Sequence, residues 1–365
     1  MVNEPKPKKK KIKLMPIFIV VFNVLAIGGM AIAEFGNSER PSKPIGELLS
    51  MLGSNWVFIA LCLASFLAIV LSETLKYFFM LRSCTKSNMF RTAFEVGVLG
   101  KYYDFITPSG SGGQPFQMYF LKKSGLSAGV SGSLPVVGFL TNQVAFIVIA
   151  IVLFIMRLPY IETGIAGDLA AGFGIVCYAA VPSLMLLFSI FPKLATSIVS
   201  WFIKIGAKIK LVKEPEAKIK KVCDTFAEYR DNLAFMAKSK SVMVLTFLLS
   251  AIAQLANAIV PYFVLVACAV ENASAIDIIT LSFYVYATVT YIPTPGSTGA
   301  AEGAFYIVFN QLSEGVLFWG TMIWRFFTYY SFILLGMLVT AITTMRDKKT
   351  SRQTAEAEPE QTLTD

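Results

Sequence analysis

The apolar positions of this chain form long blocks separated by short polar segments, a pattern typical of helices that cross a membrane. A spanning helix needs about 20 predominantly apolar residues. Six blocks reach that length, namely residues 15–33, 56–80, 130–156, 169–191, 242–270 and 315–344. The pattern therefore predicts an all-α integral membrane protein with about six spanning helices.

Two further apolar blocks, residues 88–124 and 277–314, are interrupted near their middle by Pro, Gly, Ser and Thr. The interruptions read Thr107-Pro108-Ser109-Gly110-Ser111-Gly112-Gly113 and Pro293-Thr294-Pro295-Gly296-Ser297-Thr298-Gly299. Each arm has roughly 14 to 17 residues, or roughly 21 to 25 Å of helix, which is too short to cross a bilayer. We expect two re-entrant helical hairpins that enter the membrane, turn and leave on the same side.

The basic residues predict how these elements are oriented, because Lys and Arg accumulate in cytoplasmic loops. Residues 1–15 carry six Lys, residues 74–129 seven basic residues and residues 192–241 eleven, whereas residues 271–314 carry none. With four more basic residues after Met345, both termini are expected in the cytoplasm of a multi-pass plasma-membrane protein. The same count gives the two hairpins opposite orientations, in an inverted internal repeat.

The first block has a second interpretation. A Lys-rich start, an apolar stretch and the sequence Ala31-Ile32-Ala33 also resemble a secretory signal with its cleavage site. Whether residues 1–33 are retained stays open from the sequence, and the remaining topology is the same in both cases.

Hairpin turns in two inverted halves indicate a transporter binding site near the bilayer midplane, where half-helix N-termini face an anionic group. Here the second arms are expected to begin at about Gly113 and Gly299. Backbone N–H groups at such ends can bind phosphate. Alternatively, Gly and Pro only kink two structural helices.

Charged residues within the apolar blocks are candidates for function, because charge inside a membrane is unfavourable unless it faces a cavity or a partner. The candidates are Glu73, Glu95, Lys101, Asp104, Glu302 and Arg325. Glu302 and Arg325 are expected to form the charged centre of the site, and a static buried pair is the alternative. Glu73 and Lys76 lie near the end of a span and are interpreted as interfacial, and Lys101 is interpreted as reaching the interface with its amine.

The composition excludes several kinds of chemistry. The 365 residues are 55% hydrophobic and 15% charged, with a net charge of +9, and they include no His. A Ser-His-Asp triad and a His-bound metal are therefore excluded. The five scattered Cys form no C-x-x-C pair, so neither a disulfide framework nor a zinc site is expected. The sequence also shows no nucleophile–base constellation, and we expect no catalytic residue, no metal and no cofactor.

At the level of family, the strings from Gly100 to Gly113 and from Pro293 to Glu302, followed by Arg325, resemble the lysylphosphatidylglycerol synthase transmembrane family. This is the flippase-like membrane region of multiple peptide resistance factor. The resemblance implies a translocator that moves an aminoacylated or anionic phospholipid, such as lysyl-phosphatidylglycerol, between leaflets and contributes to resistance against cationic antimicrobial peptides. It also implies two alternatives, a phosphatidylglycerol lysyltransferase that uses lysyl-tRNA or a membrane partner of a separate synthase.

Some features depart from the family pattern. Its two-domain members carry a soluble synthase domain after the membrane region, whereas only about 20 polar residues follow Met345 here. Lysyl transfer is therefore not expected to have a site in this chain, and no direct nucleic-acid contact is expected. Asp104 stands where many members have Asn, and Gln114 where an acidic residue is common, so the lipid itself stays open.

The expected organisation is a basic cytoplasmic N-terminus (residues 1–14), a flippase-like transmembrane domain (15–345) that includes a cytoplasmic helical loop (193–240), and a disordered cytoplasmic tail (346–365). Expected partners are the membrane, a phospholipid substrate, and either a second copy or a separate synthase. The expected substrate-binding residues are Asp104, Thr107, Pro108, Ser109, Gly112, Gly113, Gln114, Pro295, Gly296, Ser297, Gly299, Glu302 and Arg325.

Overall fold

The computed structural model describes most of the chain, and its regular elements in that part are all helices. The described residues are 21, 23–25, 27–32, 42–157, 172–180, 182–184, 187, 191–208, 214–220, 223–224, 239–270, 274–290, 292–309 and 315–357. The predicted all-α class is therefore confirmed.

Four helices in the described part are long and apolar enough to cross a membrane. They are Trp56–Thr85, Ala128–Met156, Lys240–Ala267 and Leu317–Asp347, and they correspond to four of the six predicted spans. The other two predicted spans, 15–33 and 169–191, are described only in part, and those parts are helical. The count of six spans stays a prediction.

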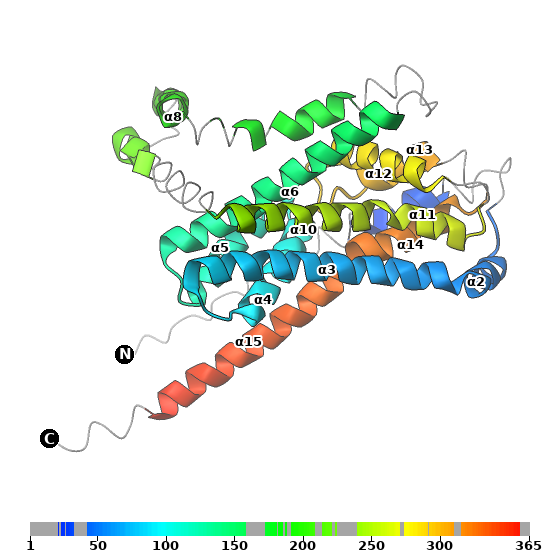
Figure 1. Cartoon of the computed structure of the whole chain (residues 1–365), viewed down its shortest axis with the longest axis horizontal. Helices are drawn as coiled ribbons and strands as arrows, with labels where there is room; N and C mark the ends of the chain where they lie inside the picture. Colours follow the sequence, from blue (N-terminus) through cyan, green and yellow to red (C-terminus); the bar gives the residue numbers. More distant parts are fainter. Residues whose placement is uncertain are drawn as a thin grey trace, which may run out of the picture.

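The long helices lie side by side along the length of the molecule (Figure 1). The short α2 (Ile45–Ser54) leads into α3 (Trp56–Thr85), and α6 (Ala128–Arg157) follows the first hairpin. The third long helix consists of α10 (Lys240–Ala258) and α11 (Val260–Ala267), with Pro261 at the start of α11, where a missing N–H does no harm. The fourth consists of α14 (Leu317–Arg325), a π-helical turn, Phe326–Tyr330, and α15 (Ser331–Ala357).

The two interrupted blocks form the predicted helical hairpins. The first hairpin consists of α4 (Phe90–Ile106) and α5 (Gly113–Lys123), and the second of α12 (Ala275–Val289) and α13 (Ala300–Phe309). In Figure 1, α4 and α5 lie toward one end of the bundle and α12 and α13 toward the other. The two hairpins therefore approach the centre from opposite ends.

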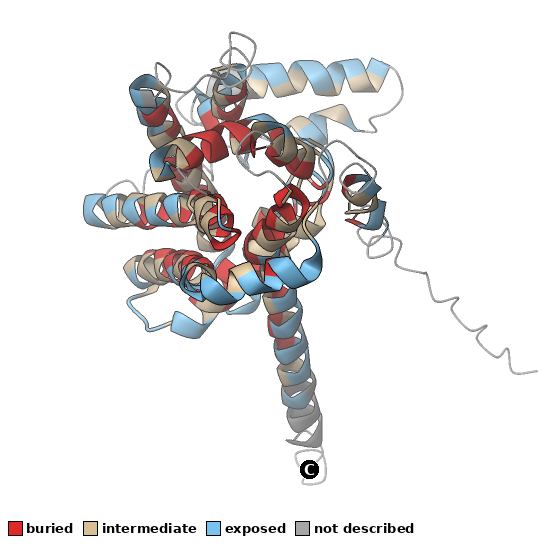
Figure 2. Cartoon of the chain, turned by 90° about the vertical axis from the view of Figure 1, so that its right-hand side faces the viewer, coloured by how far each residue is buried: buried red, intermediate tan, exposed pale blue. Residues whose placement is uncertain are grey.

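Burial separates an inner and an outer surface of the bundle. Seen along its length, buried residues face inward and exposed residues outward (Figure 2). On α3 the outward residues include Leu63, Leu67 and Leu71, each about half exposed and spaced by four. An apolar stripe on the outside of a helix indicates contact with lipid.

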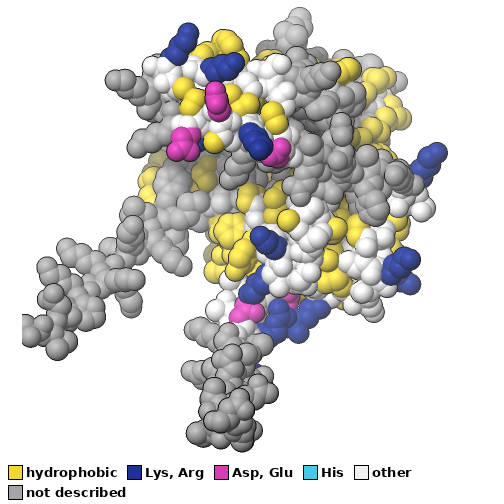
Figure 3. Space-filling view, turned by 90° about the vertical axis from the view of Figure 1, so that its left-hand side faces the viewer, with side chains coloured by type: hydrophobic (Ala, Val, Ile, Leu, Met, Phe, Trp, Pro, Cys, Tyr) yellow, Lys and Arg dark blue, Asp and Glu magenta, His cyan; other side chains and the backbone are white. Residues whose placement is uncertain are grey.

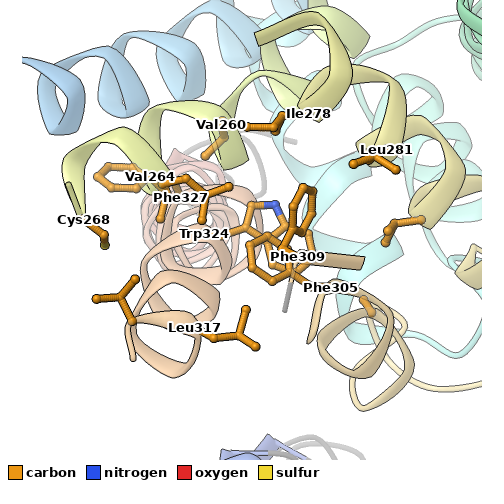
Figure 4. Packing of buried hydrophobic residues seen from close by; sticks show 14 of the residues in the cluster. Val260, Val264, Cys268, Ile278, Leu281, Phe305, Phe309, Leu317, Trp324 and Phe327 are labelled. Carbon is orange, nitrogen blue, oxygen red and sulfur yellow. The ribbon is translucent and has the colours of Figure 1, made fainter. Parts of the chain in front are cut away.

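The largest buried cluster lies where α11, α12, α13 and α14 meet (Figure 4). Trp324 stacks on Phe305 with ring centroids 4.5 Å apart, and Phe309 packs beside Phe305 at 4.5 Å. Both Trp324 and Phe305 are about 1% exposed. This aromatic packing joins the second arm of the second hairpin to the helix that carries Arg325.

One predicted boundary is wrong. Residues 346–357 were expected in a disordered tail, but α15 continues through them to Ala357. No Gly or Pro interrupts this stretch before Pro359, and Arg346 and Asp347 form ion pairs with Glu95 and Lys123 on the first hairpin. Of the predicted 193–240 loop, α8 (Pro192–Lys208) and residues 215–220 and 223–224 are helical. Residues 1–14 and 358–365 lie outside the described residues.

Candidate functional site

The turns of the two hairpins meet. Pro108 of the first turn and Pro295 of the second form an antiparallel backbone bridge, although 187 positions separate them in the sequence. Each turn contains a Ser and a Gly side by side with positive φ: Ser109 and Gly110 at 54° and 60°, and Gly296 and Ser297 at 57° and 54°. A positive φ is unfavourable for Ser, so these turns hold a strained backbone of the kind often found at functional sites.

A carboxylate satisfies a backbone N–H at the start of each second arm. The N–H of Gly113 donates to Oδ1 of Asp104 at 2.8 Å, and the N–H of Gly299 donates to Oε2 of Glu302 at 2.6 Å. Glu302 is the third residue of α13 and reaches back to the residue before the helix, as in a capping box. The half-helix N-termini that the sequence suggested for phosphate thus bind carboxylates of the chain itself.

Arg325 and Glu302 form the predicted charged pair. Nε of Arg325 donates to Oε1 of Glu302 at 2.7 Å, and the two side chains are 5% and 3% exposed. Both terminal nitrogens of Arg325 also make long contacts, at 3.4 and 3.3 Å, with the carbonyl of Gly296. A guanidinium has five N–H donors, so Arg325 has donor capacity beyond these three contacts.

The helix changes its hydrogen-bonding pattern directly after Arg325. The π-helical turn Phe326–Tyr330 follows it, and such turns are frequent at functional sites. Gly296 approaches this turn closely, because a Cβ on Gly296 would lie 2.1 Å from the Tyr329 ring. Only a glycine fits at position 296. Its lack of a side chain lets the second hairpin turn contact the helix of Arg325 closely.

A cavity of about 270 Å³ lies between the two hairpin turns and the long helices. Ser109 and Gly110 line it from the first turn, and Gly296 and Ser297 from the second. Its charged lining residues are two acidic ones, Glu73 and Asp104, and two basic ones, Lys101 and Arg325. The cavity therefore combines an apolar wall with polar groups and charges of both signs, which can satisfy the backbone of the predicted re-entrant turns.

Glu73 and Lys76 differ from the interfacial placement expected from the sequence. They are 4% and 1% exposed, and Nζ of Lys76 lies 2.6 Å from Oε2 of Glu73. The other oxygen of Glu73 accepts a hydrogen bond from Asn142 at 3.2 Å and lies 3.9 Å from Nζ of Lys101. The interfacial interpretation failed because α3 continues to Thr85 and is covered at this level by α4 and α6.

Several uncharged polar residues of the cavity were not singled out from the sequence. Asn142 and Gln143 come from α6, Gln254 and Asn257 from α10, and Thr328 from the π-helical turn. A signal for them was present, because amides inside an apolar, membrane-length helix are unfavourable unless they face a polar space. Gln254 and Asn257 are also three positions apart, on one helical face.

The predicted site residues divide into two groups. Asp104, Ser109, Gly296, Ser297 and Arg325 line the cavity. The others, Thr107, Pro108, Gly112, Gly113, Gln114, Pro295, Gly299 and Glu302, are not among its lining residues. Two of them have structural contacts instead: Oγ1 of Thr107 accepts a hydrogen bond from the N–H of Gly112 at 2.8 Å, and Oε1 of Glu302 accepts one from Nε of Arg325 at 2.7 Å. Among the described residues, no group of three or more His, Cys, Asp or Glu is arranged to hold a metal.

A comparison with protein families agrees with this architecture. Residues 18–336 match the family described as "Lysylphosphatidylglycerol synthase TM region". The match covers most of the chain, so the protein belongs to this family of membrane proteins. A search of curated proteins finds no match.

Proposed function

We propose that this protein translocates a phospholipid between the two leaflets of the plasma membrane. The observation that carries the proposal is Arg325, a buried guanidinium that lines a polar cavity between two opposed hairpin turns. A guanidinium in a dry environment binds phosphate strongly through charge-assisted, often bidentate hydrogen bonds. The lipid phosphate is the group that Arg325 would receive.

The dimensions of the cavity fit a headgroup rather than a whole lipid. About 270 Å³ is just below the range of about 300–1,000 Å³ found for small-molecule sites. The acyl chains would stay in the bilayer, in contact with the apolar outer surface of the helices. Moving only the headgroup through a polar space avoids exposing a phosphate to hydrocarbon.

The mixed charge of the lining favours a headgroup with both a phosphate and an amine, such as lysyl-phosphatidylglycerol. Arg325 and Lys101 would attract the phosphate, and Asp104 and Glu73 the amine. The side chain of Lys101 is 30% exposed, and its Nζ lies 3.9 Å from Oε1 of Glu73, where it can interact with a headgroup entering the cavity. Translocation of such a cationic lipid would lower the negative charge of the outer leaflet and so reduce binding of cationic antimicrobial peptides.

Reconstitution tests the proposal directly. The purified chain is placed in liposomes that contain fluorescent lysyl-phosphatidylglycerol or phosphatidylglycerol, and the fraction that becomes accessible to an impermeant quencher is followed over time. We expect faster exchange than in protein-free liposomes, and a loss of that exchange with Arg325→Gln. Exchange at the protein-free rate would contradict translocation.

The same preparation separates the alternatives. Incubation with labelled lysyl-tRNA and phosphatidylglycerol measures lysine incorporation into lipid. Incorporation without exchange would identify a lysyltransferase. Absence of both activities, with both restored when a separate synthase is added, would identify a membrane partner of such an enzyme.

A further inference from the structure

The helix α8 has two chemically different faces. Ile198, Trp201, Phe202 and Ile205 are spaced by three, one and three residues, so they share one side of the helix. Lys204 and Lys208, four residues apart, lie along one edge of this face, next to Trp201, together with Ser197, and Ser200 lies further round the helix. The helix has 17 residues, which corresponds to a length of about 25 Å.

The apolar face of α8 is exposed rather than packed against the bundle. Trp201 and Phe202 are 58% and 62% exposed, and Ile198 and Ile205 are 36% and 38% exposed. The half-buried residues Val199 and Ile203 lie to one side of this face. A helix whose large apolar residues are this open needs a partner outside the chain described here.

The direction of α8 indicates what that partner is. Figure 1 shows α8 end-on, whereas α3 and α10 run across the picture. The helix axis is thus nearly perpendicular to the candidate spanning helices, so it would run parallel to the surface of a membrane that they cross. It is found toward the same end of the molecule as α5 and the last part of α15, and Figure 3, which looks onto that end, shows Lys and Arg side chains on this surface.

We propose that α8 is an interfacial helix that binds the anionic surface of the membrane next to this end of the bundle. Ile198, Trp201, Phe202 and Ile205 would insert into the boundary between headgroups and acyl chains, where Trp is enriched. Lys204 and Lys208 would contact anionic headgroups. This surface is separate from the cavity, and the proposal does not depend on lipid translocation.

Quenching of Trp201 fluorescence tests this placement in the full chain. The protein is reconstituted in vesicles of phosphatidylcholine and phosphatidylglycerol, with phosphatidylcholine brominated either near the headgroup or near the chain ends. The difference between the wild type and Trp201→Phe isolates Trp201 from the other tryptophans. We expect quenching by the headgroup-proximal bromines to exceed that by the terminal ones by about twofold, with little quenching by aqueous iodide.

Each other outcome overturns the proposal. Quenching of Trp201 by iodide but not by brominated lipid would place α8 in water. Protection from both quenchers would show that a second copy or another protein covers the helix.

A charge-neutralised variant tests the role of the lysines. We expect lipid quenching of Trp201 to be stronger with phosphatidylglycerol present than with phosphatidylcholine alone, and this difference to disappear in Lys204→Gln/Lys208→Gln. The control is Lys218→Gln/Lys220→Gln, which removes two exposed lysines of the same loop outside α8 and should keep the difference. Equal effects of both variants would contradict a specific contact of α8 with anionic lipid.

Discussion

At the residue scale, the two hairpins use the same device at equivalent places. Asp104 binds the N–H of Gly113 and Glu302 binds the N–H of Gly299, so each second arm begins at a carboxylate. The carboxylates come from different arms, the first arm in one hairpin and the second arm in the other. In each case the backbone N–H that the turn leaves unpaired is satisfied inside the protein.

Asp104 has two separable roles, one in the turn and one as a charge in the cavity. Asp104→Asn keeps an oxygen that can accept the N–H of Gly113, whereas Asp104→Ala removes it. We expect Asp104→Asn to leave the melting temperature close to that of the wild type. Asp104→Ala should lower both the melting temperature and the free energy of unfolding, the latter by about 1–2 kcal/mol, as for a lost helix cap. Thermal unfolding in detergent checks this, and equal losses in both variants would contradict the capping role.

The Arg325–Glu302 pair allows a similar separation of stability from transport. Arg325→Gln leaves Glu302 as an uncompensated buried charge, which should destabilise the protein by about 3–5 kcal/mol. The double variant Glu302→Gln/Arg325→Gln removes both charges and should recover most of that stability. Since the guanidinium that we propose binds the lipid phosphate is still missing, we expect lipid exchange to stay absent in the double variant.

Thermal unfolding measures the loss of stability, and the liposome exchange assay measures the loss of lipid exchange, on the same protein preparations. Arg325→Lys is the matched control for charge, because an ammonium lacks the planar donors that contact Glu302 and Gly296 together. We expect Arg325→Lys to exchange lipid much more slowly than the wild type. Wild-type exchange by the double variant would reduce the pair to a structural role.

The sequence predicted these charged residues better than it predicted their neighbours. Arg325 and Glu302 were identified because a charge in an apolar block has few explanations. Glu73 was misjudged because its depth depends on how far α3 extends and on which helices cover it, and neither follows from the local pattern. The turn residues were found as a group, but which of them face the cavity depends on backbone dihedrals at Ser109 and Ser297 that the composition does not determine.

At the element scale, α15 is attached to the first hairpin along much of its length. Val339 packs against Val98 and Leu99 of α4. Close to the outer end, Glu95 of α4 accepts hydrogen bonds from both terminal nitrogens of Arg346, at 2.9 and 3.3 Å. Lys123 at the end of α5 pairs with Asp347, so both arms of the hairpin contact neighbouring residues of α15.

The bidentate contact of Arg346 should contribute measurably to stability, although partial exposure limits its strength. Its side chain is 37% exposed and that of Glu95 is 11% exposed, so we expect Arg346→Gln to lower the free energy of unfolding by about 1 kcal/mol. Arg91 also contacts Glu95, but its side chain is 62% exposed. Arg91→Gln should therefore have the smaller effect in the same unfolding experiment, and the reverse order would contradict this assignment.

Element boundaries were predicted well where Gly and Pro mark them and poorly elsewhere. The second arms begin at Gly113 and directly after Gly299. At both glycines the irregular backbone of the turn ends and the helix begins. The end of α15 was missed because its last part is polar. Polar residues with good helix propensity continue a helix once a preceding span has nucleated it and side chains such as Arg346 have a partner.

At the scale of the described molecule, two opposed hairpins and the long helices around them enclose a cavity that contains charges of both signs. The first hairpin reaches this centre from the end of the bundle where α5 lies, and the second from the end where α13 lies. Because both sets of turn residues line the cavity, a headgroup bound there, as we propose, would contact both hairpins. This is the arrangement that inverted repeats provide in transporters with a central site.

The orientation of this architecture in the membrane is the remaining prediction. If α4 and α5 form a re-entrant hairpin, the segments before and after it lie on the same side, whereas α3 separates Ser87 from Ser42. The distribution of Lys and Arg predicts that Ser87 and Ser124 are cytoplasmic and Ser42 is extracellular. Ser87 and Ser124 are both exposed, so a cysteine at either position should react readily.

One cysteine at a time is added at Ser42, Ser87 or Ser124, and each variant is treated with a membrane-impermeant maleimide in intact cells. The unmodified chain, with its five native cysteines, gives the background labelling. We expect labelling above this background only at Ser42→Cys, and labelling at the other two positions only after the membrane is permeabilised. The decisive comparison is between Ser87→Cys and Ser124→Cys. A hairpin gives both positions the same accessibility, whereas a pair of helices that crosses the membrane once would expose one of them and protect the other.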